Sequence, residues 1–218
     1  MSKEEKRKLL LQAASAVLME YGAHKTTLDD IAKRAGIRKT SLYYYFRDKN
    51  EIVRAIIESE MDHLLDMMVR AADSAGTAED KMYAVIETRY RFIAEKSART
   101  SKEIIREFKS LEGVFETVRE SYLRSHKELI KSILEEGIKK GEIEPIEDLE
   151  LVSLVMISSL FGCDHTFAFY DEPERVLEAL KRMVKIFFAG LRKGSAAGSS
   201  NRESRASGGT RVRKGLRI

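Results

Sequence analysis

The stretch from residue 26 to residue 51, TTLDDIAKRAGIRKTSLYYYFRDKNE, constrains the fold more than any other part of the chain. Thr27 and Asp30 have the three-residue spacing of a helix-capping box, and the same spacing recurs from Asp48. Apolar residues follow Thr27 at helical spacing, and Gly36 tolerates the positive φ with which a helix commonly ends. We therefore predict two short helices joined by a tight turn, followed by a third helix from Asp48.

The second of these helices carries mostly polar side chains that can donate hydrogen bonds. In a helix-turn-helix, the second helix enters the DNA major groove with its N-terminal residues leading. An ordinary helical hairpin with a solvated, charged face is the alternative that the pattern alone leaves open. Under the DNA-binding interpretation, the predicted phosphate contacts are Thr26, Thr27, Tyr43 and Lys49, and the predicted base contacts are Arg38, Lys39, Thr40 and Tyr44, with Ser41 beside them.

This stretch resembles the DNA-binding domain of the tetracycline-repressor (TetR) family. The resemblance rests on Ile-Ala-x-x-Ala-Gly-Ile at the turn, Leu-Tyr-x-Tyr-Phe after it and then Lys-x-Glu-Ile, and it covers about residues 8–56. Arg38 departs from the family pattern, because a Ser or Thr often caps the recognition helix there. The resemblance implies a homodimeric transcriptional repressor that binds a pseudo-palindromic operator in double-stranded DNA and is released by a small-molecule inducer.

The composition favours an all-α protein. The chain of 218 residues has two prolines and 34% charged residues, and it is long enough to bury a sizeable core. A single cysteine excludes an internal disulfide and is typical of a reducing cytoplasm. The charged N-terminus lacks the apolar core of a secretory signal, and the longest nearly apolar run, 151–163, is too short to span a bilayer. We expect a cytoplasmic, nucleoid-associated prokaryotic protein with no membrane partner.

The charge distribution divides the chain into three parts. Residues 1–50, predicted to form the three-helix DNA-binding domain, carry eleven Lys and Arg against six Asp and Glu, which suits attraction to phosphate. Residues 51–193, predicted to form a six-helix dimerisation and ligand-binding domain, carry 22 against 28. Residues 194–218 are rich in Gly, Ser and Arg, and we expect a disordered basic tail.

The body is expected to form helices at about 48–72, 79–96, 101–109, 111–140, 147–169 and 174–192. The last two have more apolar surface than one subunit easily covers, which favours a homodimer over a monomer with a well-filled core. The predicted interface residues are Leu151, Val155, Leu180, Val184, Phe187 and Phe188.

A ligand cavity is plausible inside such a bundle. Its predicted lining, in which each residue could equally be ordinary core, is Phe92, Phe108, Tyr122, Met156, Phe161 and Phe169. An apolar lining of this kind favours a hydrophobic or amphipathic ligand. The alternative is a DNA-bound adaptor that is regulated by a protein partner.

No catalytic pattern stands out. The sequence contains no P-loop, Gly-rich nucleotide turn, nucleophile elbow or Cys-x-x-Cys pair, so we predict no enzyme activity, cofactor or metal site. Cys163, Asp164 and His165 are adjacent in sequence, but successive helical residues point about 100° apart and cannot easily converge on one atom.

Overall fold

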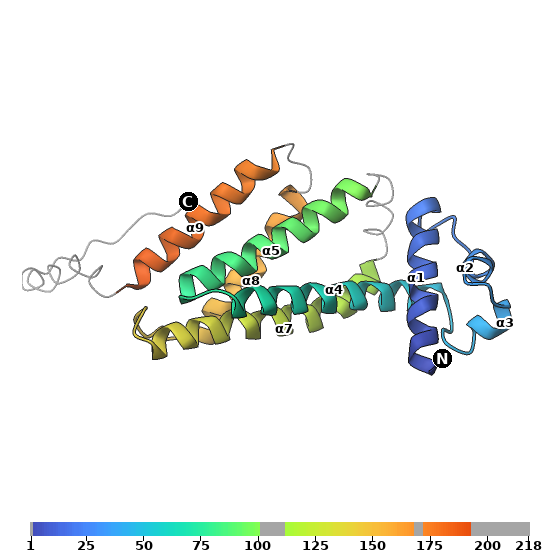
Figure 1. Ribbon diagram of the computed structural model, residues 1–218, viewed down its shortest axis with the longest axis horizontal. Helices are drawn as coiled ribbons and strands as arrows, with labels where there is room; N and C mark the ends of the chain where they lie inside the picture. The colour runs from blue at the N-terminus through green and yellow to red at the C-terminus, as the bar shows by residue number, and fades with distance from the viewer. Residues whose placement is uncertain (1, 101–111, 168–171, 193–218) are drawn as a thin grey trace, which may run out of the picture.

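A computed structural model describes residues 2–100, 112–167 and 172–192, and this part of the chain is all-α, as predicted. Its helices, shown in Figure 1, are α1 (Lys3–Tyr21), α2 (Leu28–Arg34), α3 (Lys39–Leu42), α4 (Lys49–Asp73), α5 (Ala78–Arg99), α7 (Glu112–Lys139), α8 (Leu149–Phe167) and α9 (Pro173–Leu191). The helix predicted at 101–109 and the tail predicted at 194–218 lie outside the described residues. Within the described ranges, no helix is both long and apolar enough to cross a membrane.

Helices α1 to α3 form a unit at one end of the molecule, where α1 crosses the start of α4 (Figure 1). Capping interactions explain where these helices begin. The Thr27 hydroxyl accepts from the backbone N–H of Asp30 and the Asp30 carboxylate accepts from the N–H of Thr27, so the predicted capping box is confirmed. Gly22 ends α1 with a φ of 84°, and Gly36 follows α2 with a φ of 67°.

Helix α4 belongs to two hydrophobic cores. Near its start, Ile52 and Ala55 pack with buried residues of α1, α2 and the segment around α3. Further along, Leu64 and Met68 are fully buried with residues of α5, α7 and α9. The domain boundary predicted at residue 50 therefore falls inside the first turn of a helix that continues without a break into the body.

The body is a bundle in which α4, α5 and α7 pack against one another, α8 packs on α7 and α9 packs on α5. Gly137 of α7 passes close to the first residue of α5. A Cβ atom at this position would lie 2.7 Å from the Cβ of Ala78, so a side chain there would force the helices apart. Beside this contact, Lys81 of α5 pairs with Glu136 of α7 at 2.7 Å.

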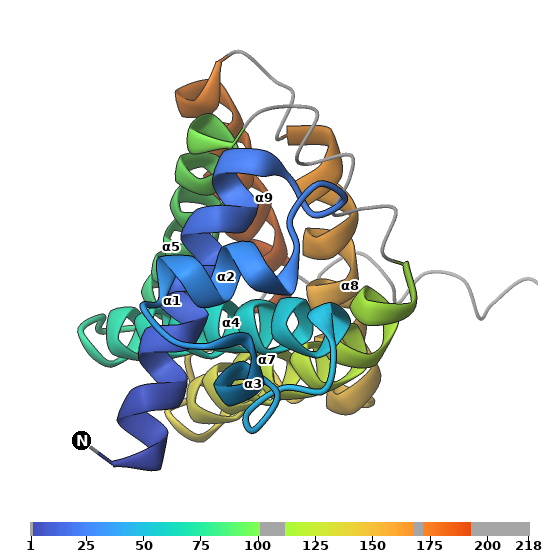
Figure 2. The same cartoon turned by 90° about the vertical axis from the view of Figure 1, so that its right-hand side faces the viewer.

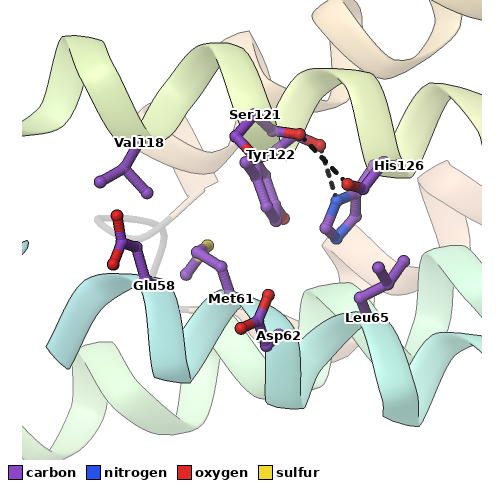
Figure 3. A pocket seen from close by; sticks show the side chains of 9 residues that line it. Glu58, Met61, Asp62, Leu65, Val118, Ser121, Tyr122 and His126 are labelled. Atoms are coloured by element: carbon purple, nitrogen blue, oxygen red, sulfur yellow. Dashed lines mark hydrogen bonds between the residues drawn. The ribbon is translucent and has the colours of Figure 1, made fainter. Parts of the chain in front are cut away.

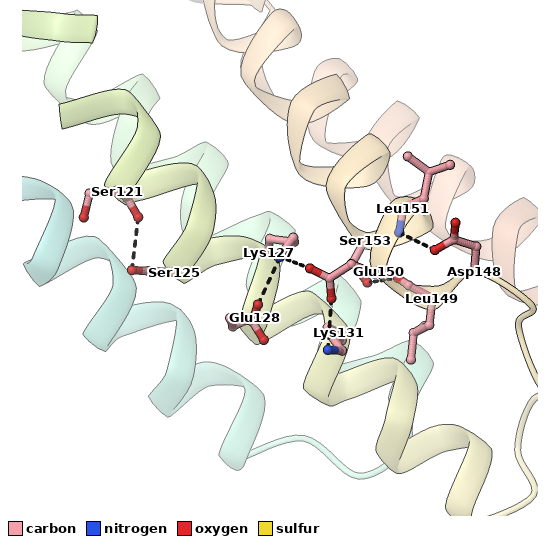
Figure 4. A network of polar contacts seen from close by, with 10 residues as sticks. All are labelled: Ser121, Ser125, Lys127, Glu128, Lys131, Asp148, Leu149, Glu150, Leu151 and Ser153. Atoms are coloured by element: carbon pink, nitrogen blue, oxygen red, sulfur yellow. Dashed lines mark hydrogen bonds and ion pairs between the residues drawn. The ribbon is translucent and has the colours of Figure 1, made fainter. Parts of the chain in front are cut away.

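Polar contacts fix the start of α8 on α7 (Figure 4). Asp148 caps α8 by accepting from the backbone N–H of Leu151 at 3.0 Å. The Glu150 carboxylate in the first turn pairs with Lys127 and with Lys131 of α7. These contacts set which side of α8 faces α7, and Leu151 is left exposed.

Candidate nucleic-acid interface

The turn between α2 and α3 is built on local backbone contacts. The backbone N–H of Ile37 donates to the carbonyl oxygen of Ala32 at 3.0 Å, and Ala32 is buried under the turn. Arg38 occupies the N-cap position of α3 and makes no side-chain capping hydrogen bond. Its side chain is exposed, so the place at which this chain departs from the TetR pattern presents a guanidinium to solvent.

Helix α3 has a buried side and an exposed, polar side. Leu42 and the following Phe46 are buried against α1 and α4, and they hold the short helix in place. The exposed side is made of Arg38, Lys39, Thr40, Ser41, Tyr43 and Tyr44. Figure 2 looks onto this end of the molecule, with α2 and α3 towards the viewer. Tyr44 is 71% exposed, which is unusual for so large an aromatic side chain.

Two side chains that the sequence analysis did not select lie beside this exposed face. The Asp29 carboxylate of α2 pairs with Lys39 Nζ at 2.7 Å and raises the pKa of Lys39, which therefore stays protonated. Lys3 Nζ of α1 lies 5.0 Å from the centroid of the Tyr44 ring. The contacts of Asp29 with Lys39 and of Lys3 with Tyr44 each join separate segments of the chain, so the periodicity of a single helix does not predict them.

Thr26, which was predicted to contact a phosphate, has a buried side chain. Its side chain is only 1% exposed, and its hydroxyl donates to the carbonyl oxygen of Gly22 at 2.7 Å. The prediction recognised a hydroxyl near a helix start. The sequence pattern did not show that the carbonyl oxygen of Gly22, at the end of α1, lies within reach of this hydroxyl and accepts its hydrogen bond.

Lys49 is also placed differently from its predicted role. Its ammonium group donates to the carbonyl oxygens of Ala23 and Thr26 at 2.6 and 3.0 Å. These bonds hold the loop between α1 and α2 against the start of α4, and they occupy the group that was expected to meet a phosphate. Thr27 is exposed, with its hydroxyl engaged in the capping box, and its phosphate contact stays a prediction.

The predicted dimer interface divides into two groups. Leu151 and Val155 of α8 are more than half exposed. Leu180, Val184 and Phe188 of α9 are buried in the core of the single chain, with Phe187 packed partly against it, so the first three cannot form a surface for a partner. Among the described side chains of α8 and α9, the large apolar ones that are exposed are Leu151, Leu154, Val155, Met183 and Ile186. The amphipathic pattern of α9 correctly indicated a buried side, but α5 of the same chain covers it.

Three of the predicted pocket residues have side chains within the described part of the chain. Tyr122 is buried, and Phe92 and Met156 pack partly buried against the core. Phe108, Phe169 and the side chain of Phe161 lie outside the described residues. Tyr122 does line a cavity of about 220 Å³ between α4 and α7, shown in Figure 3. Its other lining residues are Glu58, Met61, Asp62, Leu65, Val118, Ser121, Ser125 and His126, so this cavity has both polar and apolar walls, and the predicted apolar pocket stays a prediction.

Buried polar side chains lie at the cavity wall and directly behind it. Arg89 of α5 is 2% exposed and donates from Nη1 to the Tyr122 hydroxyl. His126 is 1% exposed, and its Nδ1 lies 2.9 Å from the carbonyl oxygen of Tyr122. Burial lowers the pKa of His126 to about 4, and the positive charge of Arg89 acts in the same direction. His126 is therefore neutral at pH 7.

Comparison with known proteins agrees with the geometry of this end of the molecule. Residues 10–56 match the family model described as bacterial regulatory proteins, tetR family. The HTH-type transcriptional regulator YhgD of Bacillus subtilis is 30% identical over 162 residues, which cover 70% of this chain and 79% of that protein. The fatty acid metabolism regulator protein of the same organism is 23% identical over 192 residues, covering 87% of this chain and 97% of the relative.

The whole described fold also has solved counterparts. One is the crystal structure of the transcriptional regulator FadR from Bacillus subtilis in complex with stearoyl-CoA. It superposes with a TM-score of 0.61 at 24% identity and covers 83% of this chain and 96% of that chain. At this identity the likeness establishes the common fold.

Proposed function

The chain belongs to the TetR family of bacterial regulatory proteins and is a DNA-binding transcriptional regulator rather than an enzyme; on that premise we propose that it is a homodimeric repressor released from its operator by a small ligand. The observation that carries this proposal is the exposed polar surface formed by α3 and its flanking residues, from Arg38 to Tyr44. Buried residues of α3 and of the segment after it hold this surface on the core of the N-terminal unit. We propose that Arg38, Lys39, Thr40 and Tyr44 meet base edges, that Ser41 lies beside them, and that Thr27 and Tyr43 contact phosphates. The protein would act on chromosomal DNA in the bacterial cytoplasm.

Two copies are needed to read a pseudo-palindrome, because each recognition helix reads one half-site. The exposed apolar residues of α8 and α9 supply a surface for self-association. Leu151, Leu154 and Val155 lie near the start of α8, which Glu150 holds on α7, and Met183 and Ile186 lie on α9; their exposure supports a contact made by helices α8 and α9 of both copies. In such a dimer the two α3 helices would lie roughly 34–36 Å apart, one turn of the DNA helix.

The ligand is proposed from the names of relatives. One is called a fatty acid metabolism regulator, and another was solved with stearoyl-CoA, so a long-chain acyl-CoA is the first ligand to test. A ligand that binds better to the form unsuited to DNA would shift the population away from the operator. Because α4 contributes to the cores of both halves, it is the element through which we expect the two sites to be coupled. Regulation by a protein partner is the alternative.

The test starts with genomic footprinting of the purified protein, which yields operator sequences. Fluorescence anisotropy then compares an operator duplex with a scrambled duplex. We expect Lys39→Ala and Tyr44→Ala each to reduce the discrimination between the two duplexes by roughly tenfold, because each removes a contact with base edges. Lys139→Ala, at the far end of α7, is the matched control and should leave discrimination unchanged. Undiminished discrimination in both α3 variants would contradict the assigned surface.

A further inference from the structure

The cavity between α4 and α7 presents an unusual set of groups. His126 and Tyr122 project from α7 and face Met61, Asp62 and Leu65 of α4 (Figure 3). His126 is almost completely buried, and its Nε2 atom has no hydrogen-bond partner among the described residues. A buried nitrogen of this kind carries a desolvation cost unless a ligand or water satisfies it.

The contact at the other ring nitrogen fixes what Nε2 can do. Nδ1 lies 2.9 Å from the backbone carbonyl oxygen of Tyr122, and a carbonyl oxygen can only accept a hydrogen bond. Nδ1 therefore carries the proton. Because the ring is neutral, Nε2 is left with a lone pair and is a hydrogen-bond acceptor, so its partner must supply an N–H or O–H.

Two carboxylates and one hydroxyl at the cavity can also accept hydrogen bonds. Glu58 and Asp62 lie four residues apart on α4, and both carboxylates border the cavity. The Ser125 hydroxyl donates to the carbonyl oxygen of Ser121 at 3.2 Å, which leaves its lone pairs available. Among the described residues that line the cavity, none is Lys or Arg. Arg89 of α5, which carries a positive charge, contacts the Tyr122 ring and is not among the residues that line the cavity.

We propose that this cavity binds a small organic cation, an amine with a short apolar chain, whose N–H groups donate to His126 Nε2 while Glu58 and Asp62 face its charge. The chain would contact Met61, Leu65 and Val118. An ammonium group has three N–H donors, one of which can bond to His126 Nε2 while the others are directed to carboxylate oxygens in charge-assisted hydrogen bonds. A carboxylate in the same place would face a lone pair and two like charges, which disfavours its binding.

This site goes beyond the proposed repressor function, because it concerns a different chemical class from an acyl-CoA. It can be tested without DNA. The probes are n-hexylamine, n-hexanol and hexanoate, which share one alkyl chain and differ in the polar end. Binding is followed by NMR, using the ring nitrogen signals of His126 and the backbone amides of α4 and α7 in the full-length protein.

We expect hexylamine to shift the His126 Nε2 signal in a saturable way, hexanol to bind more weakly and hexanoate not to bind. Asp62→Asn and Glu58→Gln keep the side-chain shape and remove one charge each, so each should weaken hexylamine binding on the order of tenfold. Asp66→Asn, an exposed position on the same helix outside the cavity, should leave the affinity unchanged.

Several results would overturn the proposal. Equal shifts with hexylamine and hexanoate would show that the alkyl chain alone binds. An unchanged affinity in both Asp62→Asn and Glu58→Gln would remove the charged site. No shift with any probe would mean that the cavity holds water only, and displacement of hexylamine by Mg²⁺ or Zn²⁺ would make it a metal site. None of these results bears on operator binding, so the repressor proposal would be judged separately.

Discussion

Lys49 begins α4, but its ammonium group reaches back to the loop between α1 and α2, where it donates to the carbonyl oxygens of Ala23 and Thr26. We predict that Lys49→Ala lowers the free energy of unfolding by about 1–3 kcal/mol, because the carbonyls at this half-buried site lose a charged donor. Urea unfolding followed by circular dichroism measures the loss, with the exposed Lys25→Ala as the control. The slope of operator affinity against salt concentration should not change, whereas loss of a phosphate contact would reduce it by about 1.

His126 gives the stability of the body a pH dependence. Its pKa is about 4 in the folded protein and close to 6.5 when unfolded, so the unfolded chain takes up the proton first as the pH falls. The resulting stability is fully present above pH 6.5 and is lost progressively towards pH 4, by an amount on the order of 3 kcal/mol. Denaturant unfolding between pH 4 and 7 should therefore be less pH-dependent in His126→Asn than in the wild type. The exposed His63→Asn is the control, and equal profiles for wild type and His126→Asn would contradict the prediction.

At the scale of elements, α9 has one side buried on α5 and another left in solvent. Ile186 is 74% exposed and Met183 is 42% exposed on α9, and Leu151 and Val155 are more than half exposed on α8. If these exposed residues join two copies, Ile186→Glu and Val155→Glu should each raise the dimer dissociation constant by roughly thirtyfold or more, because a buried charge would stand in an apolar contact.

Size-exclusion chromatography with light scattering over a range of protein concentrations measures this change. Leu9→Glu on α1 is the matched control, since Leu9 is 51% exposed and lies on the N-terminal unit. A wild-type mass equal to one chain at every concentration would contradict the dimer. An unchanged dissociation constant in both α8 and α9 variants would contradict this choice of surface.

At the scale of the whole molecule, α4 passes from the core of the N-terminal unit into the core of the body without a flexible linker. A change in how the second half of α4 packs in the body must therefore also affect how the first half of α4 packs in the N-terminal unit. If a long-chain acyl-CoA weakens operator binding by some factor, thermodynamic linkage requires the operator to weaken acyl-CoA binding by the same factor. We expect stearoyl-CoA to reduce operator affinity about 5- to 150-fold, the usual range of such coupling.

Isothermal titration of stearoyl-CoA, with and without a saturating operator duplex, tests this reciprocity. Coenzyme A without an acyl chain is the control. Operator affinity that stays constant at saturating stearoyl-CoA would reject this ligand class and leave regulation by a protein partner as the alternative.

The sequence by itself determined the helices and most of their ends. The capping box of Thr27 and Asp30, the cap at Asp48 and the positive φ of Gly36 all agree with the structure. These features depend on contacts between residues at most four positions apart, so the local sequence contains everything needed to predict them. The TetR family was also recognisable at this level, because its motif lies within one continuous stretch.

Only the tertiary structure decided which partner each side chain meets. Lys49 is a donor near a helix start, and the fold brings it to the carbonyl oxygens of Ala23 and Thr26, which lie more than twenty positions earlier in the sequence. The apolar side of α9 had to be buried, and packing within one chain selected α5 as its cover. The acceptors of the α4–α7 cavity come from positions more than fifty residues apart. Helical periodicity predicts which side of a helix is apolar. Which element covers that side depends on how segments distant in the sequence pack together, and a local sequence pattern does not contain this information.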